Sequence, residues 1–188
     1  MNSKELFVRD TTVIKQSDNL YTAEVSENWS IGNTANGGYS MTLAAKAMSE
    51  FLEHKDPLSI SAHYLDRVDF GSTEFHVTHL SSSKSLSTAR VELIQDNKIK
   101  IIFIGTFTDF SFKNDMNIYE RDVPNFPEYN SCEVIPYKEG FNPKLDKNIE
   151  KAYAQDSLWW KKDIDNSSST LNLYICLLYT SDAADELS

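Results

Sequence analysis

Residues 31–52 read IGNTANGGYSMTLAAKAMSEFL and join two adjacent glycines to a long apolar segment. The chain has only six glycines, so a Gly37-Gly38 pair at this place asks for a physical reason. Between Tyr39 and Leu52, apolar residues surround most of a helical wheel, which is typical of a helix that protein encloses on nearly every side. The segment therefore predicts a buried helix that begins at the two glycines.

Strand-like segments lie on both sides of this helix. Before it, residues 6–14 and 20–27 each predict a short strand. After it come four longer runs rich in β-branched and aromatic residues, at 58–68, 72–82, 84–95 and 98–110. Asp96-Asn97 suits a two-residue hairpin turn between the last two runs. We predict an α+β fold in which an antiparallel meander curls around a central helix.

The rest of the chain differs in composition. Residues 111–143 are rich in Asn, Asp, Pro and Tyr, and SCEVIPYKEG at 131–140 opens another strand-like segment. We predict a first domain at 1–112, a linker at 113–127 and the start of a second unit at 128–175. Residues 176–186, CLLYTSDAADE, match the translated read-through of a transposase-based sequencing adapter letter for letter. We therefore interpret 176–188 as an artefact of an incomplete gene, against the alternative of an acidic disordered tail.

Composition excludes several classes of function. The chain has 188 residues and a net charge of −10, which disfavours binding to nucleic acid and to anionic lipid surfaces. No window approaches the roughly 20 apolar residues of a membrane span, and the first residues lack a secretory signal, so we expect a cytoplasmic protein. The two cysteines, Cys132 and Cys176, lack the spacing of a zinc site. We expect no metal and no cofactor.

A series of short motifs resembles one known family. Its pieces, in order along the chain, are Trp29-x-Ile31, Gly37-Gly38-Tyr39, DPLSISAHYL at 56–65 and KSLSTARVELIQDNK at 84–98. The series resembles the acyl-CoA thioesterases that fuse two hot-dog folds in one chain, the type II thioesterases and their relatives. The resemblance covers about residues 20–110 and implies one hot-dog unit there. It also implies that 128–175 begins a second hot-dog unit, with LWWKKDID at 158–165 as a Trp-containing strand.

The resemblance implies hydrolysis of a fatty acyl-CoA to free acid and CoA. In better-known members, the Asp, Thr and Gln that activate water lie in the second unit, at positions this chain does not reach. Two alternatives stay open: a noncatalytic acyl-CoA-binding unit, and hydratase chemistry that would use His63 with an acidic partner. Because hot-dog sheets extend edge to edge, we expect a homo-oligomer or pairing with a second hot-dog unit.

The helix start is the predicted reaction site. The first N–H groups of a helix lack intrahelical partners, and glycine lets a ligand approach the backbone closely. We predict Gly38 as the catalytic oxyanion donor and Gly37 as part of the acyl site, although the pair could instead serve tight packing. Asn36 either caps the helix or contacts the substrate, and Tyr39 lines either the core or the acyl channel.

Further candidates lie on the strands that follow. By internal similarity to the family's second unit, Gln95 is a predicted catalytic residue, although a glutamine beside a turn is usually a solvated polar group. Lys84 and Arg90, together with Arg67, are the predicted contacts for CoA phosphates, with solvated strand-end charges as the alternative. His76 and His79 are three apart in a strand and face opposite ways, so they cannot form a metal pair.

Overall fold

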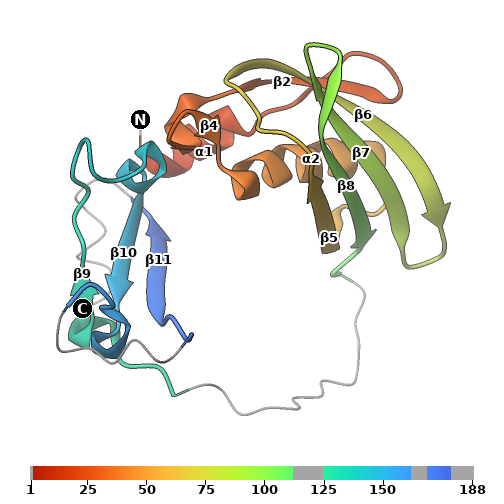
Figure 1. Cartoon of the computed structure of the whole chain (residues 1–188). Coiled ribbons are helices and arrows are strands. Elements are labelled where there is room, and N and C mark those ends of the chain that lie inside the picture. The colour runs from red at the N-terminus through yellow and green to blue at the C-terminus, as the bar shows by residue number, and fades with distance from the viewer. Residues whose placement is uncertain (1, 112–124, 162–168, 179–188) are drawn as a thin grey trace.

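The computed structural model of the chain describes residues 2–111, 125–161 and 169–178 and contains a six-stranded, a three-stranded and a two-stranded sheet. Figure 1 shows the long helix α2 (Gly37–Phe51) against the inner face of the curved six-stranded sheet. The order in that sheet is β1-β2-β6-β7-β8-β5, with antiparallel neighbours throughout. Its strands are β1 (Ile14–Lys15), β2 (Leu20–Val25), β5 (Asp56–Tyr64), β6 (Gly71–Ser82), β7 (Ser87–Gln95) and β8 (Lys98–Thr108).

Helix α2 forms the centre of the core, as the sequence predicts. Its residues Leu43, Ala44, Ala47 and Met48 have no exposed surface. Alternate residues of β7 are buried against the same core, which fits a strand with one face toward the helix. The opposite side of α2 is more open, because Lys46 and other residues there are exposed or only half-buried. The expectation of a helix enclosed on nearly every side is therefore wrong for this second face.

The N-terminal segment is a helix, α1 (Ser3–Asp10), where residues 6–14 predict a strand. Its start is fixed by a capping box. The Asn2 side chain accepts a hydrogen bond from the backbone of Glu5 at 2.8 Å, and the Glu5 carboxylate accepts one from the backbone of Asn2 at 3.2 Å. Phe7 of this helix then packs edge-on against Trp29, with 5.0 Å between ring centroids. Capping and this aromatic contact outweigh the weak strand pattern.

The predicted meander is correct for three strands and wrong for the fourth. Strands β6, β7 and β8 are consecutive neighbours, and Asp96 and Asn97 form the predicted hairpin turn with φ of 50° and 59°. Strand β5, however, pairs with β8 at the far edge of the sheet, while β2 takes the place beside β6. The sheet thus closes over α2 with strands from both sides of the helix in the sequence. Between β2 and α2 lie the 3₁₀ turn η1 (Glu27–Trp29) and the hairpin of β3 (Ser30–Ile31) and β4 (Thr34–Ala35).

The smaller sheet has the order β11-β10-β9. Its strands and the neighbouring 3₁₀ turns are β9 (Glu133–Val134), β10 (Ile149–Tyr153), β11 (Leu173–Leu177), η2 (Tyr129–Ser131), η3 (Lys144–Lys147) and η4 (Gln155–Ser157). It contacts the first part of the chain through η3, where Lys144 pairs with Glu27 at 2.6 Å. The Asn148 amide also donates to the backbone oxygen of Asn28 at 2.9 Å.

One expectation about this region needs correction. Residues 158–161 form a turn after η4, so the predicted Trp-containing strand does not begin there, and 162–165 lie outside the described residues. The backbone of Cys176 and Leu177, at the start of the predicted tail, pairs with β10. Most of the predicted linker and residues 179–188 of the tail lie outside the described residues. Among the described residues, no helix has the length and apolar character needed to cross a membrane.

Candidate functional site

A cavity of about 300 Å³ lies at the start of α2. The helix start, the end of β5 and the segment that follows β5 form most of its wall. The residues that line it are Thr34, Ala35, Gly37, Ser40, Tyr64, Leu65, Asp66, Arg67, Val68 and Ile101. Of the seven predicted site residues, only Gly37 lines this cavity. Arg67, the additional phosphate candidate, also lines it.

The two glycines differ in what their N–H groups do. The Asn36 side-chain oxygen caps the helix and accepts from Gly38 at 2.8 Å and from Tyr39 at 3.2 Å. The Gly38 N–H is therefore already used within the helix. The Gly37 N–H makes no hydrogen bond to any described residue, and Gly37 lines the cavity. The structure thus moves the available donor from Gly38 to Gly37, and it gives Asn36 a capping role.

Tyr64 explains why residue 37 has no side chain. A β-carbon at Gly37 would lie 2.9 Å from the Tyr64 hydroxyl oxygen and 3.0 Å from two atoms of its ring. Such distances are shorter than nearly all real β-carbon contacts, so a side chain at residue 37 would have to displace the Tyr64 ring. The Tyr64 hydroxyl has no hydrogen-bond partner among the described residues, and the side chain stays 53% exposed. The close approach predicted for a ligand is thus partly made by a side chain of the protein itself.

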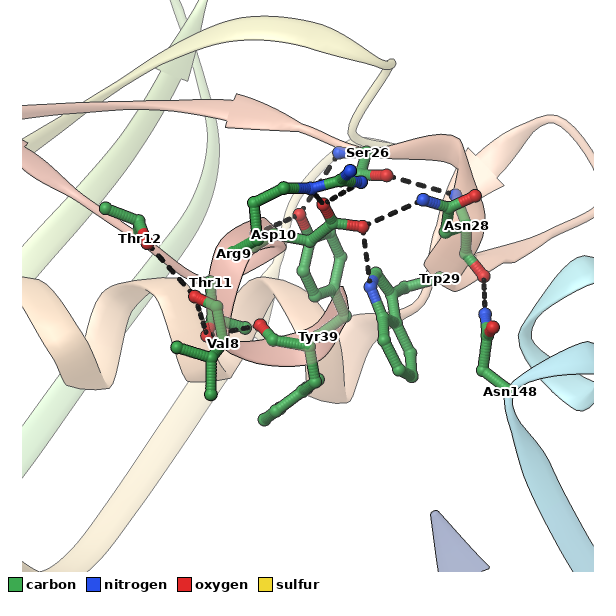
Figure 2. A network of polar contacts seen from close by, with 11 residues as sticks. Val8, Arg9, Asp10, Thr11, Thr12, Ser26, Asn28, Trp29, Tyr39 and Asn148 are labelled. Atoms are coloured by element: carbon green, nitrogen blue, oxygen red, sulfur yellow. Dashed lines mark hydrogen bonds and ion pairs between the residues drawn. The ribbon is translucent and has the colours of Figure 1, made fainter. Parts of the chain in front are cut away.

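Tyr39 lies in the core and not in the cavity (Figure 2). Its hydroxyl donates to the backbone oxygen of Asp10 at 2.6 Å and accepts from the Ser26 backbone at 3.1 Å. The ring stacks on Trp29 with 6.2 Å between centroids. Burial raises the pKa of Tyr39, so the phenol stays neutral. The core alternative for Tyr39 is the one that the structure supports, because both of its polar contacts lead to α1 and η1.

Asp10 is the centre of this network, as Figure 2 shows. Its carboxylate accepts from the indole of Trp29 at 3.1 Å and from the amide of Asn28 at 2.9 Å, and it pairs with Arg9 at 2.6 Å. Burial acts to raise the pKa of Asp10, but the hydrogen bonds from Asn28 and Arg9 outweigh it and hold that pKa below its ordinary value. The network fixes α1 and Trp29 against the helix start.

Gln95 is buried, although the alternative to a catalytic role was a solvated glutamine beside a turn. It is 7% exposed. Its amide nitrogen donates to the Asp69 backbone oxygen at 2.9 Å and to the Thr73 hydroxyl at 2.8 Å, and its oxygen accepts from the Asp69 backbone at 2.9 Å. Both polar ends are occupied by the segment that leads into β6. Gln95 does not line the cavity, and its contacts describe a structural clamp.

The predicted phosphate contacts are spread over the surface. Lys84 lies in the exposed loop between β6 and β7, and Arg90 on β7 contacts Glu92. Neither lines the cavity, whereas Arg67 does, and its guanidinium has no ion pair among the described residues. His63 is exposed and is also absent from the cavity wall. No cluster of three metal-ligating side chains occurs among the described residues.

Sequence reasoning missed two residues of the cavity, Tyr64 and Asp66. The Asp66 carboxylate accepts from the Lys100 ammonium at 3.1 Å and from the Arg67 backbone at 2.8 Å. The hydrogen bond from Lys100 is the main reason why the pKa of Asp66 lies below its ordinary value. Tyr64 is the last residue of β5 and Asp66 lies in the bend that follows, so strand alternation provides no signal that pairs them.

Comparison with known proteins agrees with this geometry. Residues 25–108 match the family model of the acyl-CoA thioesterase N-terminal domain. This segment is therefore similar to the N-terminal domain of the acyl-CoA thioesterases. It contains α2, the sheet strands from β5 to β8 and every residue that lines the cavity. No curated protein matches the chain.

Solved structures show that the thioesterase-type segment has the hot-dog fold. A Thermobifida fusca protein provisionally described as a thioesterase II has a TM-score of 0.71 and 20% identity, over 84% of this chain and 58% of that one. An Alicyclobacillus acidocaldarius protein of unknown function with a hot-dog fold has a TM-score of 0.70 and 10% identity, over 80% and 55% of the two chains. The TesB protein of Mycobacterium avium subspecies paratuberculosis has a TM-score of 0.59 and 18% identity, over 70% and 52%. The chain thus spans 52% to 58% of the length of these three proteins.

Proposed function

We propose that this protein hydrolyses a fatty acyl-CoA to the free acid and CoA. The observation that carries the proposal is that Gly37, whose N–H has no partner among the described residues, lines the α2 cavity inside the segment that matches the thioesterase family. Attack of water on a thioester places negative charge on the carbonyl oxygen. A backbone donor fixed by a helix stabilises that charge without having to reorganise during the reaction.

The helix supports this role in two ways. Its positive end faces the cavity, and the cap by Asn36 holds the first turn in place through two hydrogen bonds. Apolar lining from Leu65, Val68 and Ile101 suits the first carbons of an acyl chain. Arg67 is the cation at this cavity and is better placed for a CoA phosphate than Lys84 or Arg90. The proposed acyl and CoA contacts are therefore Gly37 and Arg67.

The test uses the full chain and acyl-CoA substrates that range from short to long. Release of fatty acid should be followed by chromatography, because Cys132 and Cys176 are free thiols that would react with thiol reagents. We expect turnover that saturates with substrate. A chain that binds acyl-CoA in calorimetry without releasing acid would instead support the noncatalytic acyl-CoA-binding unit.

We also propose that residues 128–175 begin a second hot-dog unit. The local structure of the first unit recurs there. Strand β2 is followed by one residue and the 3₁₀ turn η1, and β10 is followed by one residue and the 3₁₀ turn η4. The match to longer hot-dog structures over 84% of this chain also supports the repeat. Limited proteolysis should cut between 112 and 127 and leave two fragments if the predicted boundaries are correct.

The edge of the six-stranded sheet at β5 is open to pairing with another strand. Strand β5 ends the six-stranded sheet and has no buried residue along its nine positions. It presents Leu58 and Tyr64 as exposed apolar side chains. Asp56 and Pro57 protect only the start of this strand, and the rest of a long edge strand without charges is a template for another strand. We propose that a second copy of this chain, or a second hot-dog unit, pairs with β5.

A further inference from the structure

Among the polar side chains that line the α2 cavity, Thr34 and Ser40 donate to backbone oxygens, whereas Tyr64 and Asp66 have no role in the proposed oxyanion site. We propose that these two residues complete the reaction site, with the Tyr64 hydroxyl as a second donor to the thioester oxygen and Asp66 as the acceptor that orients water. The inference rests on the proposed thioester hydrolysis. It assigns the water-orienting group to the first unit itself.

The Tyr64 hydroxyl lies beside the start of α2. Its oxygen lies 2.9 Å from the position that a Gly37 β-carbon would take, so it borders the same part of the cavity as Gly37. No described residue accepts a hydrogen bond from this hydroxyl, and Tyr64 is 53% exposed, so the hydroxyl is free to donate to a ligand in the cavity. An acyl oxygen placed beside Gly37 supplies the missing acceptor. Two donors then converge on one atom.

Hydrogen bonds to both carboxylate oxygens hold the Asp66 side chain in place. One carboxylate oxygen accepts from the Arg67 backbone and the other from Lys100, whose own side chain is only 8% exposed. Each oxygen keeps a free lone pair, because a carboxylate oxygen can accept two hydrogen bonds. Asp66 lies in the bend two residues after the end of β5, and both Tyr64 and Asp66 line the cavity. Asp66 is the acidic residue among those that line the cavity.

The chemistry balances with these groups and one water molecule. A water O–H bond breaks and its proton passes to the Asp66 carboxylate, while the water oxygen bonds to the thioester carbon. The carbonyl electron pair moves onto oxygen, where the Gly37 N–H and the Tyr64 hydroxyl stabilise it. When the carbonyl forms again, the C–S bond breaks and its electron pair leaves on sulfur. The Asp66 proton then passes to the thiolate, which gives CoA and the free acid.

The deciding experiment measures kcat and KM of the full chain for an acyl-CoA that the unmodified protein hydrolyses. Asp66→Asn should lower kcat by about a hundredfold or more, as loss of a positioned proton acceptor does. Tyr64→Phe should lower kcat by about tenfold to a hundredfold, as loss of one oxyanion donor does, with KM little changed. Both effects belong in kcat because both groups act in the transition state.

The matched control is Asp69→Asn. Asp69 also lies near Lys100, at 3.9 Å, but does not line the cavity. A structural role shared through Lys100 would therefore affect both aspartates alike. We expect kcat of Asp69→Asn to stay close to that of the unmodified protein, and circular dichroism should show that all three variants are folded. Equal losses for Asp66→Asn and Asp69→Asn, or a Tyr64→Phe effect confined to KM, would overturn the inference.

A separate measurement distinguishes this inference from the proposed function. If the unmodified chain releases no acid from any acyl-CoA, hydrolysis fails and the role of Asp66 fails with it. The donor role of Tyr64 is then decided by calorimetry with a nonhydrolysable acyl-CoA ketone, which keeps the carbonyl oxygen. Tyr64→Phe should weaken binding of this ketone by about tenfold, which corresponds to one lost hydrogen bond. Unchanged binding would rule that role out.

Discussion

Gly37 is the residue at which packing and proposed chemistry meet. Replacement by alanine would drive a methyl group into the Tyr64 ring, because the new β-carbon would lie 2.9 Å from the hydroxyl oxygen. We expect Gly37→Ala to displace Tyr64 from the cavity and to lower kcat by about tenfold or more, since small displacements of positioning groups are costly. Helix propensity favours alanine by about 0.5–1 kcal/mol, so the free energy of unfolding should change little.

Gly38→Ala is the natural comparison for that prediction. The nearest atom to its β-carbon would be the Asn36 cap oxygen at 3.1 Å, and the cavity would be untouched. Steady-state kinetics on both variants, with thermal melts for stability, separate the two glycines. A larger kinetic loss for Gly38→Ala than for Gly37→Ala would restore Gly38 as the oxyanion donor.

Replacement of Gln95 tests whether this residue, predicted to be catalytic by similarity, has only a structural role. Gln95→Ala removes three hydrogen bonds and leaves the Asp69 backbone and the Thr73 hydroxyl without their partner. We expect the free energy of unfolding to fall by about 1–3 kcal/mol in urea titrations. The kcat of the folded variant should stay within about threefold of the unmodified value, because Gln95 does not line the cavity. A folded variant that lost a hundredfold in kcat would show that Gln95 is catalytic.

Asp10 gives the fold a dependence on pH. Its pKa in the folded protein is lowered below the ordinary value of 3.8, so folding favours the ionised carboxylate. The resulting stability is present above the unfolded pKa and is lost as the pH falls through the folded pKa. We expect the free energy of unfolding to decline below about pH 4, and Asp10→Asn to flatten this decline. Urea titrations of both proteins between pH 7 and pH 3 measure the difference.

Single elements show which parts of the fold a sequence can reveal. Helix α2 and the β7–β8 hairpin were predictable, because their patterns are long and their turn chemistry is local. Helix α1 was missed since its apolar residues are few, and its signal was the Asn2 and Glu5 capping pair. The place of β5 in the order of the sheet could not be predicted from the sequence. Strand periodicity reports which face is buried and says nothing about which strand lies alongside.

The candidate site was predictable to the same extent. The Gly-Gly pair before an apolar helix predicts a site at the helix start, and a cavity does lie there, because glycine and a helix start are local features. The available donor was misassigned by one residue, since sequence alone does not show that the Asn36 cap uses the Gly38 N–H. Tyr64 and Asp66 reach the cavity only through the pairing of β5 with β8 and the contact with Lys100. These are tertiary contacts that no short motif encodes.

The β7–β8 turn permits a prediction about one element. Asn97 adopts a positive φ of 59°, a region in which glycine carries no steric cost, and it holds the second position of the turn. Asn97→Gly should therefore stabilise the hairpin, by about 0.5 kcal/mol, since Asp-Gly is a preferred pair for such turns. A rise in the urea midpoint without a change in slope is the expected result. A lower midpoint would mean that the Asn97 side chain contributes more than its backbone strain costs.

For the whole molecule, the open edge at β5 links fold, assembly and the cavity. Tyr64 belongs to that edge and also borders Gly37, so a strand added to β5 would restrict the side chain on which the site depends. The proposed assembly is therefore expected to affect activity as well as size.

Leu58→Lys tests this link, because Leu58 is 56% exposed on β5 and a lysine on an edge strand opposes pairing. Sedimentation velocity should show a shift from dimer to monomer, while circular dichroism stays unchanged. The control is Leu80→Lys, which places the same charge at a 49% exposed leucine on β6, a strand that does not pair with β5 or with its neighbour β8. Dissociation by Leu80→Lys alone would place the interface elsewhere. If both variants remain dimeric, the β5 edge is not the contact, and Tyr64 is held only by its own chain.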